Sequence, residues 1–174
     1  MASSPPPNCF FFLLLLLPMS ITLVAAADDI HLHFFFHEKV AGTPNATSIA
    51  VVDKGGFGTL KVYDNALRVT AELDSAIIGR GQGMGAYSTL TSVGGALTVM
   101  NLVFTAGEYS GSTLALMGVF TMGSVSERSI VGGSGQFRLA RGYALTKVVS
   151  PTGATTTVAE FDVYLTISTK YISK

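Results

Sequence analysis

The three histidines of the chain lie close together, at His31, His33 and His37. Alternate residues of an extended strand share a face, so all three are expected on one side of a strand. A His-x-His pair can ligate a metal ion such as zinc. His37 lies about 13 Å beyond His33 along an extended chain, which is too far to complete the same tetrahedral site. We therefore predict a row of polar strand positions and no metal site.

The glycine-rich segment 79–85 (GRGQGMG) is a second candidate for chemistry, because glycine loops can cradle phosphates. Its spacing does not give the dinucleotide-binding fingerprint, and no helical pattern follows it. It predicts a strand with bulges. The single cysteine, Cys9, lies at the N-terminus, and the chain has no Gly-x-Ser-x-Gly elbow or Walker loop. No ligand set for a metal, haem or flavin is recognisable, so we expect no cofactor and no redox activity of its own.

Asn45-Ala46-Thr47 is an acceptor sequence for N-glycosylation. Pro44 precedes it and indicates an exposed turn. We predict a glycan on Asn45 if the chain enters the secretory pathway, whereas turn chemistry alone is the alternative.

Residues 1–27 differ from the rest, because they contain no charged side chain and no glycine. The apolar run Phe10–Leu17 is interrupted by Pro18, and the segment ends in three alanines at 25–27. This pattern is typical of a secretory signal peptide, whereas an uncleaved anchor or an N-terminal core helix is the alternative. We predict a signal peptide over 1–27, a single mature domain over 28–174, and a secreted product without disulfides.

Charge excludes one class of partner. The 11 Lys and Arg balance the 11 Asp and Glu, and all of them follow residue 27. A chain without net charge or a basic stripe is not expected to bind nucleic acid. Charged residues make up only 13% of the sequence, so part of the surface is expected to be covered by another subunit in a homo-oligomer.

The elements that would position these residues are strands, because apolar residues recur with a period of two between glycines and prolines. The segments are 30–37, 48–52, 58–64, 77–78 with the glycine-rich stretch that follows, 96–104, 113–121, 137–149 and 158–167. Several are apolar on both faces and need cover on both sides. A closed antiparallel barrel with about eight strands and an apolar lumen meets that need and removes sheet edges.

Six segments resemble the plant dirigent family. They are HFFFHEKVAGTPNAT (33–47), FGTLKVYDNALR (57–68), GRGQG (79–83), NLVFTAGEYSGSTL (101–114), VGGSGQFRLARGYA (131–144) and AEFDVYL (159–165). The order and spacing of these segments along one chain are more specific than any one of them. The resemblance implies an all-β, eight-stranded antiparallel barrel, similar to allene oxide cyclase and calycin-like barrels, and a secreted oligomer (a dimer or trimer) in the apoplast.

The resemblance also implies a function. Members of the family bind phenoxy radicals or quinone methides made by a separate laccase or peroxidase, and they bias the stereochemistry of coupling in phenylpropanoid biosynthesis. Orientation in an apolar lumen suffices for this, because radical coupling is itself fast. The expected product class is lignan- or lignin-like. Two alternatives remain open: a cyclase or dehydratase that acts on a quinone methide, and a cell-wall binding or scaffold protein in defence.

Candidate site residues follow from the resemblance. Glu38 stands at the end of the first strand, where related proteins that direct lignan coupling carry an acid, and it is the candidate pocket acid. The candidate substrate-binding residues are Arg80, Gln82, Tyr87, Phe120, Arg138 and Arg141. The chain departs from the family pattern at four places: Gly81, Ser110, Phe120, which stands near the position of a second acid, and segment 124–129, where an Arg-Glu pair is usual.

Overall fold

The computed structural model describes residues 27–90, 95–151 and 154–168. The strands are β1 (Ala27–Lys39), β2 (Ser48–Val52), β3 (Leu60–Arg68), β4 (Ile77–Tyr87), β5 (Ala96–Phe104), β6 (Thr113–Phe120), β7 (Ser126–Ser134), β8 (Arg141–Val148) and β9 (Thr156–Ser168). The described residues contain one 3-10 turn, η1 (Gly135–Phe137). No helix among them is long and apolar enough to cross a membrane. The predicted signal peptide, apart from Ala27, lies outside the described residues.

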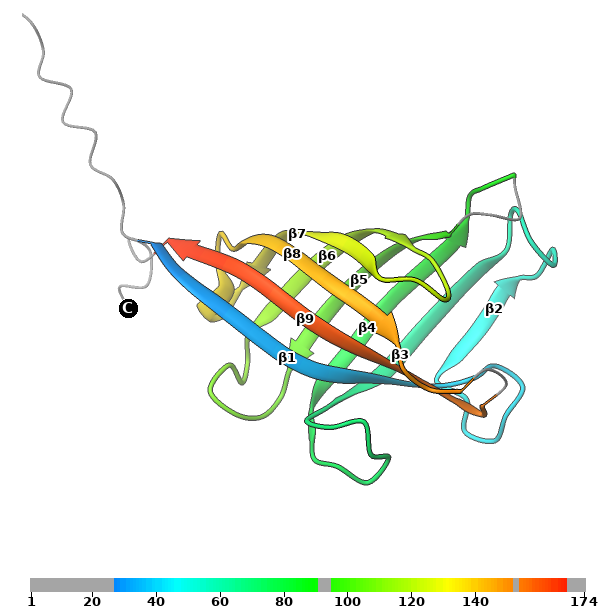
Figure 1. Cartoon of the computed structure of the whole chain (residues 1–174), viewed down its shortest axis with the longest axis horizontal. Coiled ribbons are helices and arrows are strands. Elements are labelled where there is room, and N and C mark those ends of the chain that lie inside the picture. Colours follow the sequence, from blue (N-terminus) through cyan, green and yellow to red (C-terminus); the bar gives the residue numbers. More distant parts are fainter. Residues whose placement is uncertain (1–26, 91–94, 152–153, 169–174) are drawn as a thin grey trace, which may run out of the picture.

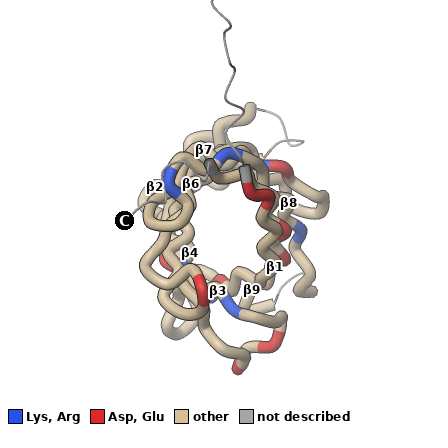
Figure 2. The backbone as a smooth tube through the Cα atoms, turned by 90° about the vertical axis from the view of Figure 1, so that its left-hand side faces the viewer, with Lys and Arg blue, Asp and Glu red and all other residues tan. Residues whose placement is uncertain are grey.

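The strands form one antiparallel sheet that closes on itself. From β3 to β9 each strand pairs with the next in the chain, β9 pairs with β1, and β1 pairs with β3. The closing contact is short and joins Phe35–His37 to Ala66–Arg68. The short β2 pairs with the other half of β3 and extends the barrel wall there. Figures 1 and 2 show the resulting barrel. The prediction of an all-β barrel of eight antiparallel strands is confirmed.

One strand was missed. The sequence analysis assigned no strand to Ser126–Ser134, which forms β7, and it merged two elements into one run over 137–149. β7 buries Ser126 and Arg128 on its inner face beside Ile130, so its inward side does not look apolar in the sequence. The run over 137–149 is broken because Phe137 ends the 3-10 turn and Leu139 has a φ of 63°. β8 therefore begins only at Arg141.

Aromatic and aliphatic side chains fill one end of the barrel. Phe34 of β1 stacks on Phe161 of β9 with a centroid distance of 5.3 Å. Phe137, carried into the barrel by η1, is fully buried and packs 5.5 Å from Phe104. Each such ring contributes about 1.5–3 kcal/mol by its burial. This end is therefore a packed core, and the cavity described below lies toward the opposite end.

The inward positions of β4 from Gly79 to Gly85 are glycines, which place no side chain inside the barrel. A Cβ placed on Gly81 would lie 2.6 Å from Cε2 of Phe36, so the Phe36 ring occupies the space that a side chain would fill. The register between β4 and β5 runs without a shift from Gly79 to Tyr87, and the β3–β4 ladder has one shift, between Leu67 and Arg68. The predicted bulges are thus largely wrong. Gly81 makes room for Phe36, whereas an added Cβ on Gly79 or Gly83 would lie 2.3 Å from the carbonyl oxygen of Val103 or 2.2 Å from that of Val99, in the β5 backbone.

Candidate functional site

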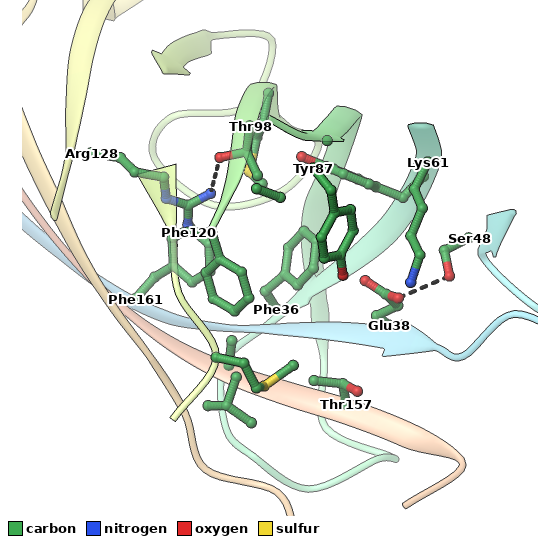
Figure 3. Close-up of a pocket in the computed structure, with 17 residues that line it drawn as sticks. Phe36, Glu38, Ser48, Lys61, Tyr87, Thr98, Phe120, Arg128, Thr157 and Phe161 are labelled. Carbon is green, nitrogen blue, oxygen red and sulfur yellow. Dashed lines mark hydrogen bonds between the residues drawn. The ribbon is translucent and has the colours of Figure 1, made fainter. Parts of the chain in front are cut away.

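A cavity of about 130 Å³ opens at the end of the barrel opposite Phe137. Its walls come from the strand ends that meet there (Figure 3). The lining residues are Phe36, Glu38, Ser48, Lys61, Tyr63, Gly85, Tyr87, Ala96, Thr98, Met100, Phe120, Met122, Arg128, Val148, Thr157, Ala159 and Phe161. An apolar cavity of about 150 Å³ takes up a benzene molecule. The space therefore suits one aromatic ring, with the remainder of a ligand at the mouth.

Aromatic rings make up much of the wall. Phe36 stacks on Phe161 at 5.6 Å and meets Tyr63 edge to face at 6.0 Å. Burial raises the pKa of Tyr63 to about 12, against the opposing effect of Arg128, so this hydroxyl stays protonated at neutral pH. Offset and edge-to-face contacts of this kind favour a further aromatic guest.

Glu38 places a carboxylate at the cavity wall. It follows Phe36 by two positions on β1, so both side chains point inward. Its carboxylate accepts a hydrogen bond from Ser48 Oγ at 2.8 Å and a longer one from Asn65 Nδ2 at 3.4 Å. Ser48 and Asn65 hold the carboxylate in place while leaving it at the cavity wall.

Arg128 places a guanidinium at the same cavity. It is 3% exposed and lies on β7, with Cζ 5.0 Å from the centroid of the Phe161 ring and 5.8 Å from that of Phe120. Nη1 donates to Thr98 Oγ1 at 3.2 Å, whereas Nε has no hydrogen-bond partner among the described residues. Burial lowers the pKa of Arg128 to about 10, so the guanidinium remains charged at neutral pH. A buried cation with an unused donor is an obvious partner for a ligand oxygen.

Three of the predicted site residues lie at this cavity. Glu38, Tyr87 and Phe120 all line it, and Lys61 lies over the Tyr87 ring with Nζ 5.7 Å from the centroid. Phe120 shows the consequence of the departure from the family pattern. Near the position where the resemblance implied a second acid, this chain places the Phe120 ring 5.8 Å from Cζ of Arg128.

Arg80 and Gln82 do not line the lumen, contrary to prediction. They alternate with the inward glycines of β4 and therefore lie on the outer surface. Arg80 Nε forms an ion pair with Asp64 Oδ1 at 2.8 Å. This hydrogen bond, chiefly, lowers the pKa of Asp64.

Arg138 and Arg141 lie away from the cavity as well. Arg138 directly follows η1, near the packed end of the barrel, and is exposed. Arg141 donates through Nη1 to the carbonyl oxygens of Val131 at 3.1 Å and Ala140 at 2.9 Å. Both arginines belong to the turn around η1, whose backbone the Arg141 bonds brace.

Arg128, Tyr63 and Lys61 are cavity residues that the sequence analysis missed. Arg128 falls within segment 124–129, which departs from the family pattern, and no strand was expected there. A two-residue step from the apolar Ile130 would have indicated an inward position for Arg128. Lys61 and Tyr63 share one face of β3, and the sequence analysis predicted a strand over 58–64 without deciding which face points inward.

The family model for dirigent-like proteins matches residues 29–166, which span the whole barrel. The chain belongs to the dirigent family. Among curated relatives, Dirigent protein 21 of Arabidopsis thaliana is 40% identical over 144 residues, which are 78% of this chain and 75% of that protein. Pterocarpan synthase 1 of Glycine max is 38% identical over 130 residues, 69% of this chain and 68% of that protein.

Solved dirigent structures agree with the barrel. The pterocarpan synthase dirigent protein GePTS1 superposes with a TM-score of 0.76 at 33% identity and covers 83% of this chain and 93% of its own. A pyocyanin demethylase shares the fold alone, with a TM-score of 0.56 at 12% identity. The barrel fold thus has counterparts of known structure.

Proposed function

We propose that this dirigent protein binds one reactive phenolic intermediate, a phenoxy radical or a quinone methide, and fixes the face on which it reacts. The observation that carries the proposal is the unpaired Nε of Arg128, buried in an aromatic cavity of single-ring size. The cavity is large enough for a phenolic ring beside Phe36, Phe120 and Phe161, and a small shift of the Arg128 side chain would bring its unused N–H to the ring oxygen.

Binding in one pose is enough to control the product. Coupling of phenoxy radicals needs little lowering of a barrier, so the stereochemical outcome depends on which face of the bound molecule stays open. The packed end behind the cavity covers one side of the guest, and the mouth leaves the other accessible. In this proposal a separate laccase or peroxidase makes the radical, and the product is of the lignan or lignin type.

The direct test is to oxidise a panel of 4-hydroxycinnamyl alcohols with a laccase, with and without the purified protein, and to separate the dimers by chiral chromatography. We expect an enantiomeric excess with at least one alcohol only when the protein is present, and a smaller excess with Glu38→Gln. Racemic dimers from every alcohol would contradict the coupling role and favour ring closure or binding to cell-wall polymers.

A second candidate, ring closure of a quinone methide, is favoured by the position of Glu38 in the same cavity as Arg128. In its acid form Glu38 would give its proton to the quinone-methide oxygen while a hydroxyl of the same substrate attacks the exocyclic carbon. A C–O bond forms, the ring becomes aromatic, and the hydroxyl proton returns to the carboxylate. The similarity to the pterocarpan synthases supports this candidate.

The two candidates differ in their need for an oxidant. A cyclase that first removes water from a phenolic alcohol to form the quinone methide, and then closes the ring, converts that alcohol to a cyclic ether without laccase or peroxidase. Incubating the protein with such alcohols, for example isoflavanols, and analysing the products by mass spectrometry would show a loss of 18 mass units only for the cyclase. No conversion without laccase, together with an enantiomeric excess when laccase is present, would support the coupling role and exclude the cyclase.

We also propose that copies of the chain associate through the outer face of β4, β5 and β6. Met84, Val99 and Met117 lie in register across these strands, each about half exposed, and Leu97 and Val119 extend the apolar surface. Large contiguous apolar patches on a surface often mark a site of protein–protein contact. A second copy that presents the same face would cover it.

Secretion to the apoplast and N-glycosylation stay part of the proposal. Asn45 is exposed in the turn between β1 and β2, with a φ of 57°, so a glycan there would project into solvent. A shift in mass on treatment with an N-glycosidase, absent in Asn45→Gln, would test both ideas in protein collected from a plant cell medium.

A further inference from the structure

The outer face of the β1–β9 pair carries an imidazole and carboxylate cluster remote from the cavity. His31 and His33 of β1 lie beside Glu160 and Asp162 of β9, because His33 and Asp162 are direct partners in the antiparallel register. All four side chains are between about one third and one half exposed. The cluster links the first and last strands of the barrel.

Both histidines lie within hydrogen-bond distance of the same carboxylate oxygen. His31 Nε2 lies 2.9 Å and His33 Nδ1 lies 3.0 Å from Asp162 Oδ1. Glu160 Oε1 lies 3.7 Å from His33 Nε2, and one ligand atom from each of His33, Glu160 and Asp162 fits within a 4.8 Å span. A tetrahedral ion with bonds of about 2.0–2.2 Å holds its ligand atoms roughly 3.4 Å apart, so small movements of the side chains would suffice.

Aromatic neighbours hold the two imidazoles in place. His31 stacks on Tyr164 with a centroid distance of 4.5 Å and an interplanar angle of 11°, and Tyr164 stacks in turn on Tyr143 at 5.2 Å. His33 meets the edge of Phe35 at 5.2 Å and 89°. Since ring orientation is already fixed, less conformational entropy would be lost when a ligand binds.

The charge of the cluster also suits a cation. Among the described residues, the ion-pair partners of Glu160 and Asp162 are the two histidines, and no Lys or Arg pairs with either carboxylate. Lys147 of β8 is the residue opposite Glu160 in the register, and it is exposed. Mixed imidazole and carboxylate ligands without a thiolate match divalent first-row transition ions, whereas Ca²⁺ and Mg²⁺ prefer oxygen ligands alone.

We propose that His33, Glu160 and Asp162, with His31 beside them, form a binding site for a divalent transition-metal ion of the zinc class. Sequence analysis predicted no metal site, because it considered histidines of one strand alone. The missing ligands come from β9, more than a hundred residues later in the chain. A bound ion would clip β1 to β9 and so stabilise the closed barrel.

The test uses protein purified without a histidine tag, titrated with ZnCl₂ by isothermal calorimetry. We expect one ion per chain and a melting temperature that rises by about 5 °C at saturation. Asp162→Asn and His33→Gln should each weaken Zn²⁺ binding at least tenfold. Glu127→Gln, which removes an exposed carboxylate on β7, is the matched control and should change neither value.

A spectroscopic readout separates a metal site from a set of hydrogen bonds. Cu²⁺ used as a probe should show nitrogen hyperfine coupling from the His33 imidazole in its electron paramagnetic resonance spectrum, and this coupling should be lost in His33→Gln. Binding weaker than millimolar, or Zn²⁺ affinity unchanged in Asp162→Asn, would overturn the proposal and leave the cluster as a hydrogen-bonded link between the strands. Circular dichroism confirms that each variant remains folded.

Discussion

The guanidinium of Arg128 lies 5.0 Å from the centre of the Phe161 ring, inside the barrel and within the cavity wall. Such an arrangement is costly for stability, because a buried cation loses its hydration and Arg128 forms no ion pair with an acid among the described residues. Thr98 satisfies one of its donors, and the two rings of Phe161 and Phe120 supply weaker attraction. The position is easier to understand as preparation for a ligand than as a contribution to folding.

Arg128→Met should therefore separate stability from binding. Replacement of a buried unpaired cation by an apolar side chain is expected to leave the free energy of unfolding unchanged or to raise it by about 1–2 kcal/mol. Loss of a hydrogen bond from a charged donor should weaken the binding of a stable phenol, such as coniferyl alcohol, by about 1.5–3 kcal/mol, or at least tenfold. Urea denaturation and isothermal calorimetry measure the two quantities.

Arg138→Met is the control for this pair of measurements, because Arg138 is exposed and lies away from the cavity. It should alter neither stability nor affinity by more than about 0.5 kcal/mol. A strongly destabilised Arg128→Met variant with normal affinity for phenols would show that the arginine has a structural role only.

Gly81→Ala should destabilise the barrel. The added methyl group would lie 2.6 Å from Phe36 Cε2 and 2.9 Å from its Cδ2, so the ring must shift. Overpacking of this kind costs about 1–3 kcal/mol. Gly132→Ala is the matched control, since the nearest atom to its added methyl is 3.9 Å away. Thermal unfolding measures both, and equal melting temperatures for the two variants would refute the idea that Phe36 depends on the glycine.

Stability should depend on pH through His37. This side chain is buried, donates through Nε2 to the Thr70 carbonyl oxygen at 3.1 Å, and has no partner for Nδ1 among the described residues. Burial lowers the pKa of His37 below its ordinary value of 6.5. As the pH falls below 6.5, His37 is protonated in the unfolded chain before it is protonated in the folded chain. The free energy of unfolding therefore decreases in that range.

The His37→Gln variant should flatten this dependence, because glutamine can donate the same hydrogen bond without titrating. Melting temperatures measured from pH 7.5 to pH 5 should fall more steeply for the unaltered protein than for the variant. Parallel curves would mean that His37 does not contribute to the pH dependence.

The proposed interface predicts that Val99→Glu lowers the oligomeric state. Val99 is 45% exposed between Met84 and Met117 on the outer face, and an acid there would lose hydration in any contact between copies. Light scattering coupled to size exclusion should give a monomer mass. Leu73→Glu, in the loop between β3 and β4 and 60% exposed, is the control and should keep the native mass. An unchanged mass for Val99→Glu would show that copies of the chain do not associate through this face.

Strand periodicity was sufficient to predict the barrel. Alternation in β9, where Phe161, Val163 and Leu165 are buried between more exposed neighbours, gives both the strand and its inner face. Periodicity failed in β7, because Ser126 and Arg128 point inward and are buried despite their polarity. Polar residues at inward positions are where the site lies, so the same feature that hid the strand also hid the cavity arginine.

The site was predicted only in part for a related reason. Glu38 was predicted from the resemblance, and the structure places it on the inward face of β1, two positions after Phe36. Arg80 and Gln82 were misplaced because glycine gives no sign of which face of β4 is buried. The cluster of His33 with Asp162 depends on the pairing of the first and last strands, which local sequence patterns do not encode.

The most direct measurement for the central claim is the enantiomeric excess of phenolic dimers formed by a laccase in the presence of the unaltered protein, Arg128→Met or the control Glu127→Gln. We predict a clear excess with the unaltered protein and with Glu127→Gln, and a nearly racemic mixture with Arg128→Met. An excess that Arg128→Met preserves in full would contradict the account, because the pose of the intermediate would then not depend on the buried guanidinium.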